Sequence, residues 1–276
     1  MKFFISADME GVAGLVSWKE YEDDFPRLRR FFTAEVKAVC EGILESGVKV
    51  DQILVCDAHG PGQGLLIEDL PEQVRLSRGN GRPLMMMDGL DRTFDLVYFV
   101  GYHSGVGTPQ SVMDHTYSSR TFFRILINGK DVDEAGINAG LAGFFGVPVG
   151  FVSGDDKLVR RARREFPGIE TVVTKDSSSR FAAITRHPGP VLQELKEKAA
   201  KTAGRVRELR PYTLGRGEVK LEFQLATTAH ADLVGLIPGV KRVDGRTIIG
   251  RARNMREAYA LLRLAAILGG SASAYL

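Results

Sequence analysis

The sequence predicts an α/β protein: a doubly wound, mostly parallel sheet domain with a second, smaller α+β domain. Short apolar runs at 3–7, 52–56 and 96–100 are separated by other segments, of which 27–46 has helical periodicity. A strand, a helix and a second strand in this order predict a right-handed crossover and parallel pairing. A chain of 276 residues can bury such a core as one large domain or as two.

The first half of the chain supplies most of the expected sheet. The helix at 27–46 follows the first strand, and Gly47 occupies the position of a C-cap glycine. The elements expected after it are strands at 52–56, 83–87 and 96–100, a strand at 121–127 turning at Asn128-Gly129, a small-residue helix through 145 and a strand at 147–152.

The pattern changes near residue 156. The elements expected beyond it are a basic helix at 157–165, a strand at 170–173, a polar segment at 175–180, a charged helix at 190–209, strands at 219–226 and 247–249, and an apolar helix at 255–268. We therefore expect an α/β metal-binding catalytic domain at 1–155. A smaller α+β domain at 156–276 is expected to contribute to the pocket and to an oligomer interface.

The composition argues against several classes of protein. An apolar share of 44% and a charged share of 26% are ordinary for a soluble globular protein. Its densest basic clusters, at 27–30 and 160–164, lie on expected helices, where a solvated face is favoured over a nucleic-acid patch. We expect neither a membrane span nor a secretory signal. Cys40 and Cys56 belong to no CxxC pair, which fits a reducing cytoplasm.

The first expected strand ends in the acidic motif Asp8-Met9-Glu10-Gly11. Residues two apart on a strand point to the same face, so the side chains of Asp8 and Glu10 lie together. Two adjacent carboxylates repel unless a cation or a shared proton lies between them. The motif alone leaves two interpretations open, a metal site or a solvated loop that caps the next helix.

Other elements end or begin with side chains that bind metals. His59 and His103 each follow an expected strand, and the carboxyl ends of parallel strands meet at one edge. Imidazoles and carboxylates without thiolates suit zinc, manganese or cobalt in a hydrolytic site. If Asp8 bridges two ions, Glu10 and His59 can complete the first. His103 and Glu134 can complete the second, and each ion keeps an open position for water.

Several short segments occur in a fixed order over the first 156 residues. They are Asp8-Met9-Glu10-Gly11, Asp57-Ala58-His59, Gly101-Tyr102-His103, Val112-Met113-Asp114-His115, Glu134-Ala135-Gly136-Ile137-Asn138-Ala139 and Val152-Ser153-Gly154-Asp155-Asp156. This ordered set resembles the D-aminopeptidase family of dinuclear zinc metallopeptidases (DppA-like, M55-type). Each segment alone is a weak signal, whereas the set is specific.

The resemblance implies a cytoplasmic metallo-aminopeptidase that removes N-terminal D-amino acids from short peptides, using a metal-activated water at a dinuclear zinc site. It implies a large ring-shaped homo-oligomer whose active sites face an enclosed space. It assigns the catalytic role to His115 and the zinc ligands to Asp8, Glu10, His59, His103 and Glu134. The loops at 60–64 and 104–114 depart from the family, so D-specificity is less directly implied than the metal chemistry.

His115 also has a chemical argument of its own. It is not needed to complete either ligand set, and a free imidazole of near-neutral pKa can donate a proton to the leaving amine. The alternative is an incidental loop histidine. We interpret His187 as structural and His230 as a packing or interface residue. Asp156 is favoured as a helix N-cap, and Asp155 stays open between a cap and a partner of the histidines.

Two other functions remain as alternatives. A dinuclear metal phosphohydrolase would use the same pair of ions, although the glycine-rich loop at 60–64 lacks the Lys and Ser/Thr of a P-loop and the GxGxxG spacing. A non-catalytic, metal-stabilised ring protein would be indifferent to the loss of His115, whereas the enzyme would lose hydrolysis.

Overall fold

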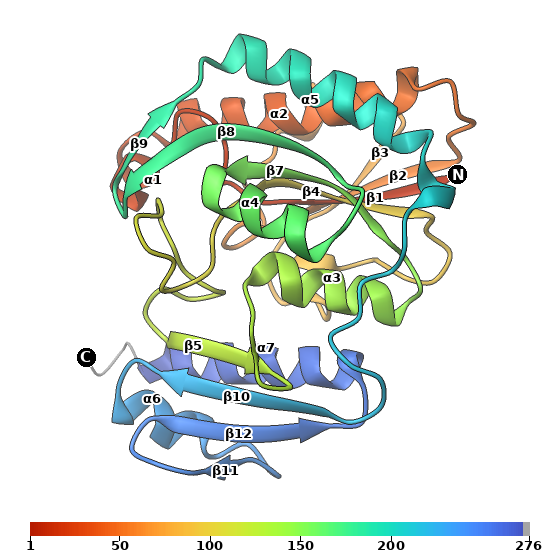
Figure 1. The fold of residues 1–276 in the computed structure, drawn as a ribbon. Coiled ribbons are helices and arrows are strands. Elements are labelled where there is room, and N and C mark those ends of the chain that lie inside the picture. Colours follow the sequence, from red (N-terminus) through yellow and green to blue (C-terminus); the bar gives the residue numbers. More distant parts are fainter. Residues whose placement is uncertain (273–276) are drawn as a thin grey trace.

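The computed structural model of the chain describes residues 1–272, which form two sheets with helices between and outside them (Figure 1). The strands of the first sheet are β1 (Lys2–Ala7), β2 (Gln52–Asp57), β3 (Val74–Ser77), β4 (Leu96–Tyr102), β7 (Val149–Asp155), β8 (Glu170–Ser179) and β9 (Ala182–Thr185). Their order is β3-β2-β1-β4-β7-β8-β9, and all neighbours are parallel except β8 and β9. The predicted doubly wound parallel sheet is confirmed.

Helices cover both faces of the first sheet. On one face α2 (Phe25–Glu45) packs against α5 (Pro188–Ala203), and on the other lie α3 (Glu134–Phe144) and α4 (Asp156–Glu165). Successive residues of β1 alternate between these faces: Phe3 belongs to the core beneath α2, and Phe4 belongs to the core shared with α3. A short helix, α1 (Trp18–Asp23), follows the β1 loop.

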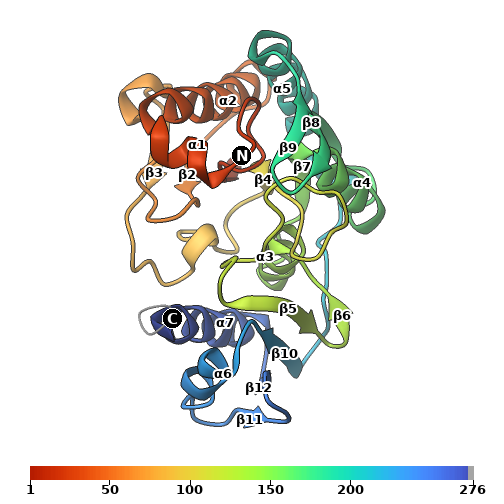
Figure 2. The same cartoon turned by 90° about the vertical axis from the view of Figure 1, so that its left-hand side faces the viewer.

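The second sheet is antiparallel and lies below the first in Figures 1 and 2. Its strands are β5 (Phe122–Ile127), β6 (Lys130–Asp131), β10 (Val219–Leu225), β11 (Lys241–Arg242) and β12 (Thr247–Ala252), in the order β11-β12-β10-β5-β6. The helices α6 (Thr228–Val234) and α7 (Met255–Ala272) pack on it, and α7 also contacts α3. Within residues 1–272, no helix combines the length and apolarity that a bilayer span requires.

A boundary at residue 155 does not separate the two sheets. The strands β8 and β9 follow that boundary but extend the first sheet, whereas β5 and β6 precede it and belong to the second. Antiparallel pairing of β5 with β10 joins segments almost a hundred residues apart, and the local sequence pattern does not reveal such partners. We therefore propose the two sheets with their own helices, instead of 1–155 and 156–276, as the units of the chain.

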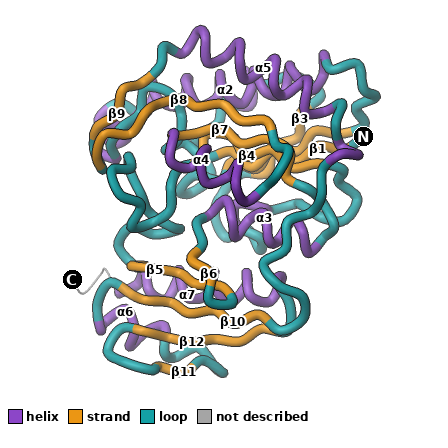
Figure 3. The backbone as a smooth tube through the Cα atoms, in the orientation of Figure 1, coloured by secondary structure: helices purple, strands orange, loops and turns teal. Residues whose placement is uncertain are grey.

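Several local expectations were wrong. The segment 83–87 contains the 3-10 helix η2 (Met85–Met87), and the strand beside β2 is the earlier β3. The polar residues 175–179 continue β8 because that end of the strand pairs with β9 at an exposed edge (Figure 3). The charged helix ends at Ala203 and is followed by η3 (Val206–Glu208), and a further 3-10 turn, η1, spans Ile67–Asp69.

Candidate metal centre

Close backbone contact between β1 and β4 brings their carboxyl ends together. The amide of Gly11 donates to the carbonyl of Gly101, with an N···O distance of 2.7 Å. A Cβ at Gly11 would lie 1.8 Å from the carbonyl oxygen of Tyr102, so only glycine fits there. Gly101 has φ of +68°, and a Cβ there would lie 2.2 Å from the carbonyl oxygen of Asp8. These glycines place the β1 acidic motif beside His103.

The structure brings the predicted ligands into one cluster at this edge. His103 Nε2 lies 3.5 Å from both Asp8 Oδ2 and Glu134 Oε2. His59 Nε2 lies 3.4 Å from Glu10 Oε1. The carboxylates come from the end of β1 and the start of α3, where the side chain of Asp133 caps the helix by accepting from Gly136 N.

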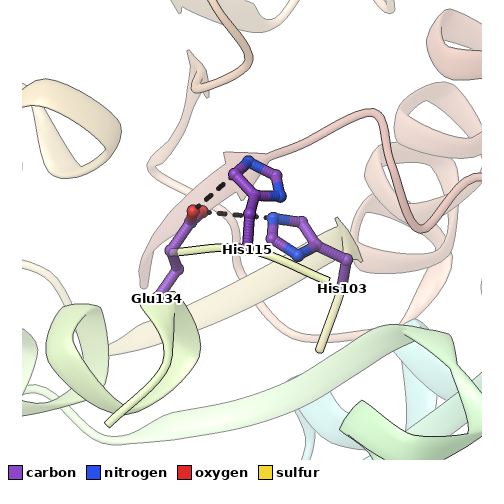
Figure 4. A group of neighbouring side chains, drawn as sticks. All are labelled: His103, His115 and Glu134. Atoms are coloured by element: carbon purple, nitrogen blue, oxygen red, sulfur yellow. Dashed lines mark ion pairs between the residues drawn. The ribbon is translucent and has the colours of Figure 1, made fainter. Parts of the chain in front are cut away.

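His115 completes the cluster and stacks on His103. The two rings are parallel within 4°, with centroids 4.1 Å apart, and His115 Nε2 lies 3.8 Å from Glu134 Oε1 (Figure 4). His115 Nε2 also lies 3.7 Å from Glu10 Oε1. His115 Nδ1 lies 2.9 Å from the carbonyl of Met113. Because a carbonyl only accepts, Nδ1 carries the proton, and the Nε2 of neutral His115 presents its lone pair to the carboxylates.

The donor set fits divalent cations. Asp8 Oδ2, Glu10 Oε2 and His103 Nε2 are buried and have no hydrogen-bond partner among residues 1–272. Two ligands of one tetrahedral ion, each bound at about 2.1 Å, lie about 3.4 Å apart, close to the His–carboxylate distances above. Two groups of potential ligands share His103. One adds Asp8 and Glu10, and the other adds His115 and Glu134.

The electrostatics of the cluster also call for cations. Burial, followed by the charges of Glu10 and Glu134, raises the pKa of Asp8 well above its usual value. Burial disfavours the charged form of His103, but the carboxylates of Glu134, Glu10 and Asp8 together outweigh it and raise the pKa of that imidazole. His115 differs, because burial and the neighbouring His103 lower its pKa. The neutral form of the His115 imidazole is therefore favoured.

Residues that the sequence analysis did not select hold the cluster in place. Lys175 on β8 is buried, and its Nζ donates to the carbonyl of Glu10 over 2.7 Å. The amide of Tyr117 donates to Glu134 Oε1 over 2.6 Å, and Trp18 Nε1 donates to Glu10 Oε1 over 3.3 Å. Trp18 could have been selected from the sequence because it is the only tryptophan in it. Nothing in the sequence distinguishes Lys175 and Tyr117 from other residues of their types.

Asp155 links β7 to the loop after His103. Its carboxylate accepts from Ser104 N and Ser104 Oγ, at 2.8 and 2.7 Å, and also caps α4. The preference for Asp156 as the cap was wrong, because the chain turns into α4 one residue earlier. His187 caps α5, and His230 lies buried in α6 with its Nδ1 2.7 Å from Thr227 Oγ1.

A cavity of about 920 Å³ opens over the cluster, with a size suited to a small ligand. Its wall includes the carboxylates Asp8, Glu10 and Glu134 with His59, His115 and Trp18, whereas His103 does not line it. Residues of α7, including Arg263 and Ile267, also line it. The cavity is therefore built by both sheets and their helices.

Comparisons with known proteins identify the family of the chain. A family model described as D-aminopeptidase, peptidase family M55, matches residues 1–264. A D-aminopeptidase of Bacillus subtilis (strain 168) is 32% identical over 265 residues, which cover 94% of each chain. A solved structure described as the Zn-dependent D-aminopeptidase DppA from Bacillus subtilis, a self-compartmentalizing protease, superposes with a TM-score of 0.93 at 31% identity and covers 98% of both chains. The chain therefore belongs to the D-aminopeptidase family of M55 peptidases.

Proposed function

We propose that this protein is a metal-dependent aminopeptidase that hydrolyses the N-terminal peptide bond of short peptides with D-amino-acid N-termini. The observation that carries the proposal is the convergence of buried carboxylates and imidazoles on one cavity. Several of their atoms have no hydrogen-bond partner among the described residues. Membership of the D-aminopeptidase family selects peptide hydrolysis over the phosphohydrolase and non-catalytic alternatives.

The ligands proposed for two zinc ions are Asp8, Glu10, His59, His103 and Glu134, with Asp8 shared between the ions. Bound zinc would supply Lewis-acid polarisation of the scissile carbonyl. The DppA structure described as zinc-dependent supports this choice of metal. Among the described residues, His115 belongs to one of the two groups of potential ligands, whereas His59 belongs to neither. The proposed set nevertheless takes His59, whose Nε2 lies 3.4 Å from Glu10 Oε1, and assigns another role to His115, whose Nε2 lies 3.7 and 3.8 Å from the carboxylates.

His115 is assigned the proton transfer to the leaving amine. Its lowered pKa keeps the imidazole neutral in the resting site, so Nε2 can take up a proton and pass it on. The hydrogen bond from Nδ1 to Met113 fixes the ring and its tautomer. Trp18 contacts the ring edge-on, with centroids 5.4 Å apart, and limits the access of water to it.

The proposal includes a homo-oligomer, with a large ring as its finer form. The similar DppA structure is described as a self-compartmentalizing protease, which requires several subunits around a space. Large apolar side chains that an interface could cover include Ile184, which is 73% exposed, and Leu236, which is 70% exposed. A cytoplasmic location is also proposed, since Cys40 and Cys56 are free, buried thiols.

The test compares wild type, His115→Ala and the control His187→Ala on D-Ala and L-Ala p-nitroanilides, D-Ala dipeptides and p-nitrophenyl phosphate. We expect zinc-loaded wild type to hydrolyse the D-configured substrates. His115→Ala should keep its metal and assembly but lose at least about a hundredfold in kcat. His187→Ala removes a histidine that does not line the cavity and should retain activity.

Each arm of this test can contradict part of the proposal. Full activity of His115→Ala would remove that residue from catalysis, and loss of metal from it would make His115 a ligand. Preference for L-configured substrates would refute only the D-specificity. Turnover of the phosphate ester alone would replace the aminopeptidase with a phosphohydrolase.

A further inference from the structure

Three arginines line the cavity, and their surroundings differ. Arg82 donates to the carbonyls of Asp57 and Ser77, at 2.6 and 3.2 Å. Arg263 donates to the carbonyl of Gly81 over 2.7 Å. Arg120 has neither a hydrogen bond nor an ion pair to any side chain or carbonyl within residues 1–272, so its charge is available to a ligand.

A hydrogen-bonded turn fixes the place of Arg120 in the chain, although its guanidinium has no partner in the part of the chain that the structure describes. Ser118 Oγ accepts from Thr121 N over 3.2 Å and lies 2.9 Å from Thr121 Oγ1, and Phe122 N donates to the Ser118 carbonyl over 3.3 Å. This turn leads directly into β5. The backbone that carries Arg120 is therefore anchored to the second sheet.

Arg120 also lies within reach of a short substrate. It follows Tyr117 by three residues, and the Tyr117 amide binds the Glu134 carboxylate of the cluster. Three residues span at most about 11 Å of backbone, which is comparable to an extended tripeptide. Arg120, unpaired within residues 1–272, thus lies in the wall of the same cavity as Glu134, and the backbone that separates it from Tyr117 is no longer than a short peptide.

We propose that Arg120 binds the C-terminal carboxylate of the peptide substrate and so selects short peptides with a free C-terminus. This inference rests on the proposed aminopeptidase function. A peptide that is cut at its N-terminal bond keeps its carboxylate on the leaving side, away from the metal ligands. A guanidinium matches a carboxylate with two parallel hydrogen bonds, and a substrate without this charge loses that pairing.

The experiment measures kcat/KM for a D-alanyl dipeptide or tripeptide and for its C-terminal amide, which differs only in that charge. We expect zinc-loaded wild type to prefer the acid over the amide by about tenfold to a hundredfold, the range for a hydrogen bond to a charged group. In Arg120→Gln this preference should fall to near one, mainly through KM, and Arg120→Lys should restore part of it. The control Arg92→Gln removes an exposed arginine that does not line the cavity and should keep the wild-type preference.

The outcomes separate this inference from the function on which it rests. Equal wild-type turnover of acid and amide, or an Arg120→Gln variant that retains the preference, would overturn the carboxylate site and leave the aminopeptidase intact. An equal loss of both substrates in Arg120→Gln would also overturn it, because a carboxylate partner acts only on the acid. Failure of wild type to cleave either peptide would instead refute the proposed function.

Discussion

Asp8 and Glu10 lie two residues apart, yet their surroundings displace the two pKa values in opposite directions. Burial and two neighbouring carboxylates raise the pKa of Asp8. Burial also opposes the ionisation of Glu10, but His59 and then His115 outweigh it and lower that pKa. Burial and the adjacent carboxylates therefore favour a positive charge beside Asp8, which is where the shared ion is proposed.

A second buried acid, outside the ligand set, gives a pH-dependent prediction. Burial raises the pKa of Glu35 to about 7, and its only hydrogen bond among the described residues comes from Ala13 N at 2.8 Å. The pKa of Glu35 is thus higher in the folded chain than in the unfolded chain, where it is near 4.5. This difference stabilises the fold below about pH 4.5, and the stabilisation is lost as the pH rises through about 7. Glu35→Gln should therefore gain stability relative to wild type between pH 5 and 8, by up to about 3 kcal/mol.

Urea unfolding of both proteins in a chelator, at pH 5, 6.5 and 8, measures this difference without metal binding. The glutamine carbonyl can still accept from Ala13, so the comparison isolates the charge. The control is Glu72→Gln, at an exposed carboxylate that forms no ion pair within the described residues. If the difference in unfolding free energy between wild type and Glu35→Gln were the same at all three pH values, Glu35 would not be protonated in the fold.

The clustering of polar side chains at the strand ends could be predicted from the sequence. His59 and His103 follow apolar runs, and parallel strands bring such ends to one edge. The supporting residues could not, because their roles depend on distant contacts. Lys175 lies within a polar segment whose sequence gave no sign of burial. Its side chain contacts Glu10 because β8 pairs with β7 in the first sheet.

At the scale of elements, the β8–β9 hairpin supports the loop that carries His115. The carbonyl of Arg180 accepts from Met113 N over 2.8 Å, and Arg180 Nη1 donates to Asp114 Oδ1 over 2.7 Å. The guanidinium also lies 5.5 Å from the centre of the Trp18 ring. Met113 has φ of +49°, so this loop holds a conformation that needs external support.

Weakening this support should impair catalysis while leaving the metal in place. Arg180→Gln removes the ion pair with Asp114 but not the backbone bond, so we expect about a tenfold fall in kcat from misplacement of His115. Metal content and KM should change little, and Arg180→Lys should recover part of kcat. The control Arg124→Gln breaks a surface ion pair with Asp131, at 2.6 Å on the second sheet. It should alter neither kcat nor KM. A change in KM alone would show that the hairpin contacts substrate instead.

The sequence predicted elements best where burial imposes a pattern. Buried strands such as β4 read as continuous apolar runs, and the Asn128-Gly129 turn was confirmed as a hairpin, with both residues at positive φ. The outer part of β8 is polar because its side chains are exposed, and so it lacks the apolar run of a core strand. The short β3 was missed, since four residues give little periodicity.

At the scale of the whole molecule, the cavity depends on how the two sheets are stacked. The helix α7 belongs to the second sheet but contacts α3, which supplies Glu134, and its residues Arg263 and Ile267 line the cavity. Buried Tyr259 on α7 donates to Asn138 Oδ1 on α3 over 2.8 Å. The sequence indicated that α7 is apolar on several sides and packs against other elements. It did not indicate that one of these elements is α3, the helix that supplies Glu134.

Metal binding should consequently stabilise the entire fold. Asp8, Glu10 and Glu134 are only 2–3% exposed and repel one another until cations neutralise them. Zinc at a hundredfold excess over its dissociation constant adds about 2.7 kcal/mol per site, so a chelator should lower the wild-type Tm by about 5–10 °C.

Calorimetry and metal analysis should also distinguish the roles of Asp8 and Glu10. If Asp8 is shared, Asp8→Asn loses both ions and most of the zinc-dependent rise in Tm, whereas Glu10→Gln loses mainly one. Equal loss in the two variants would contradict a bridging Asp8, and an unchanged Tm in chelator would contradict the coupling of metal to fold.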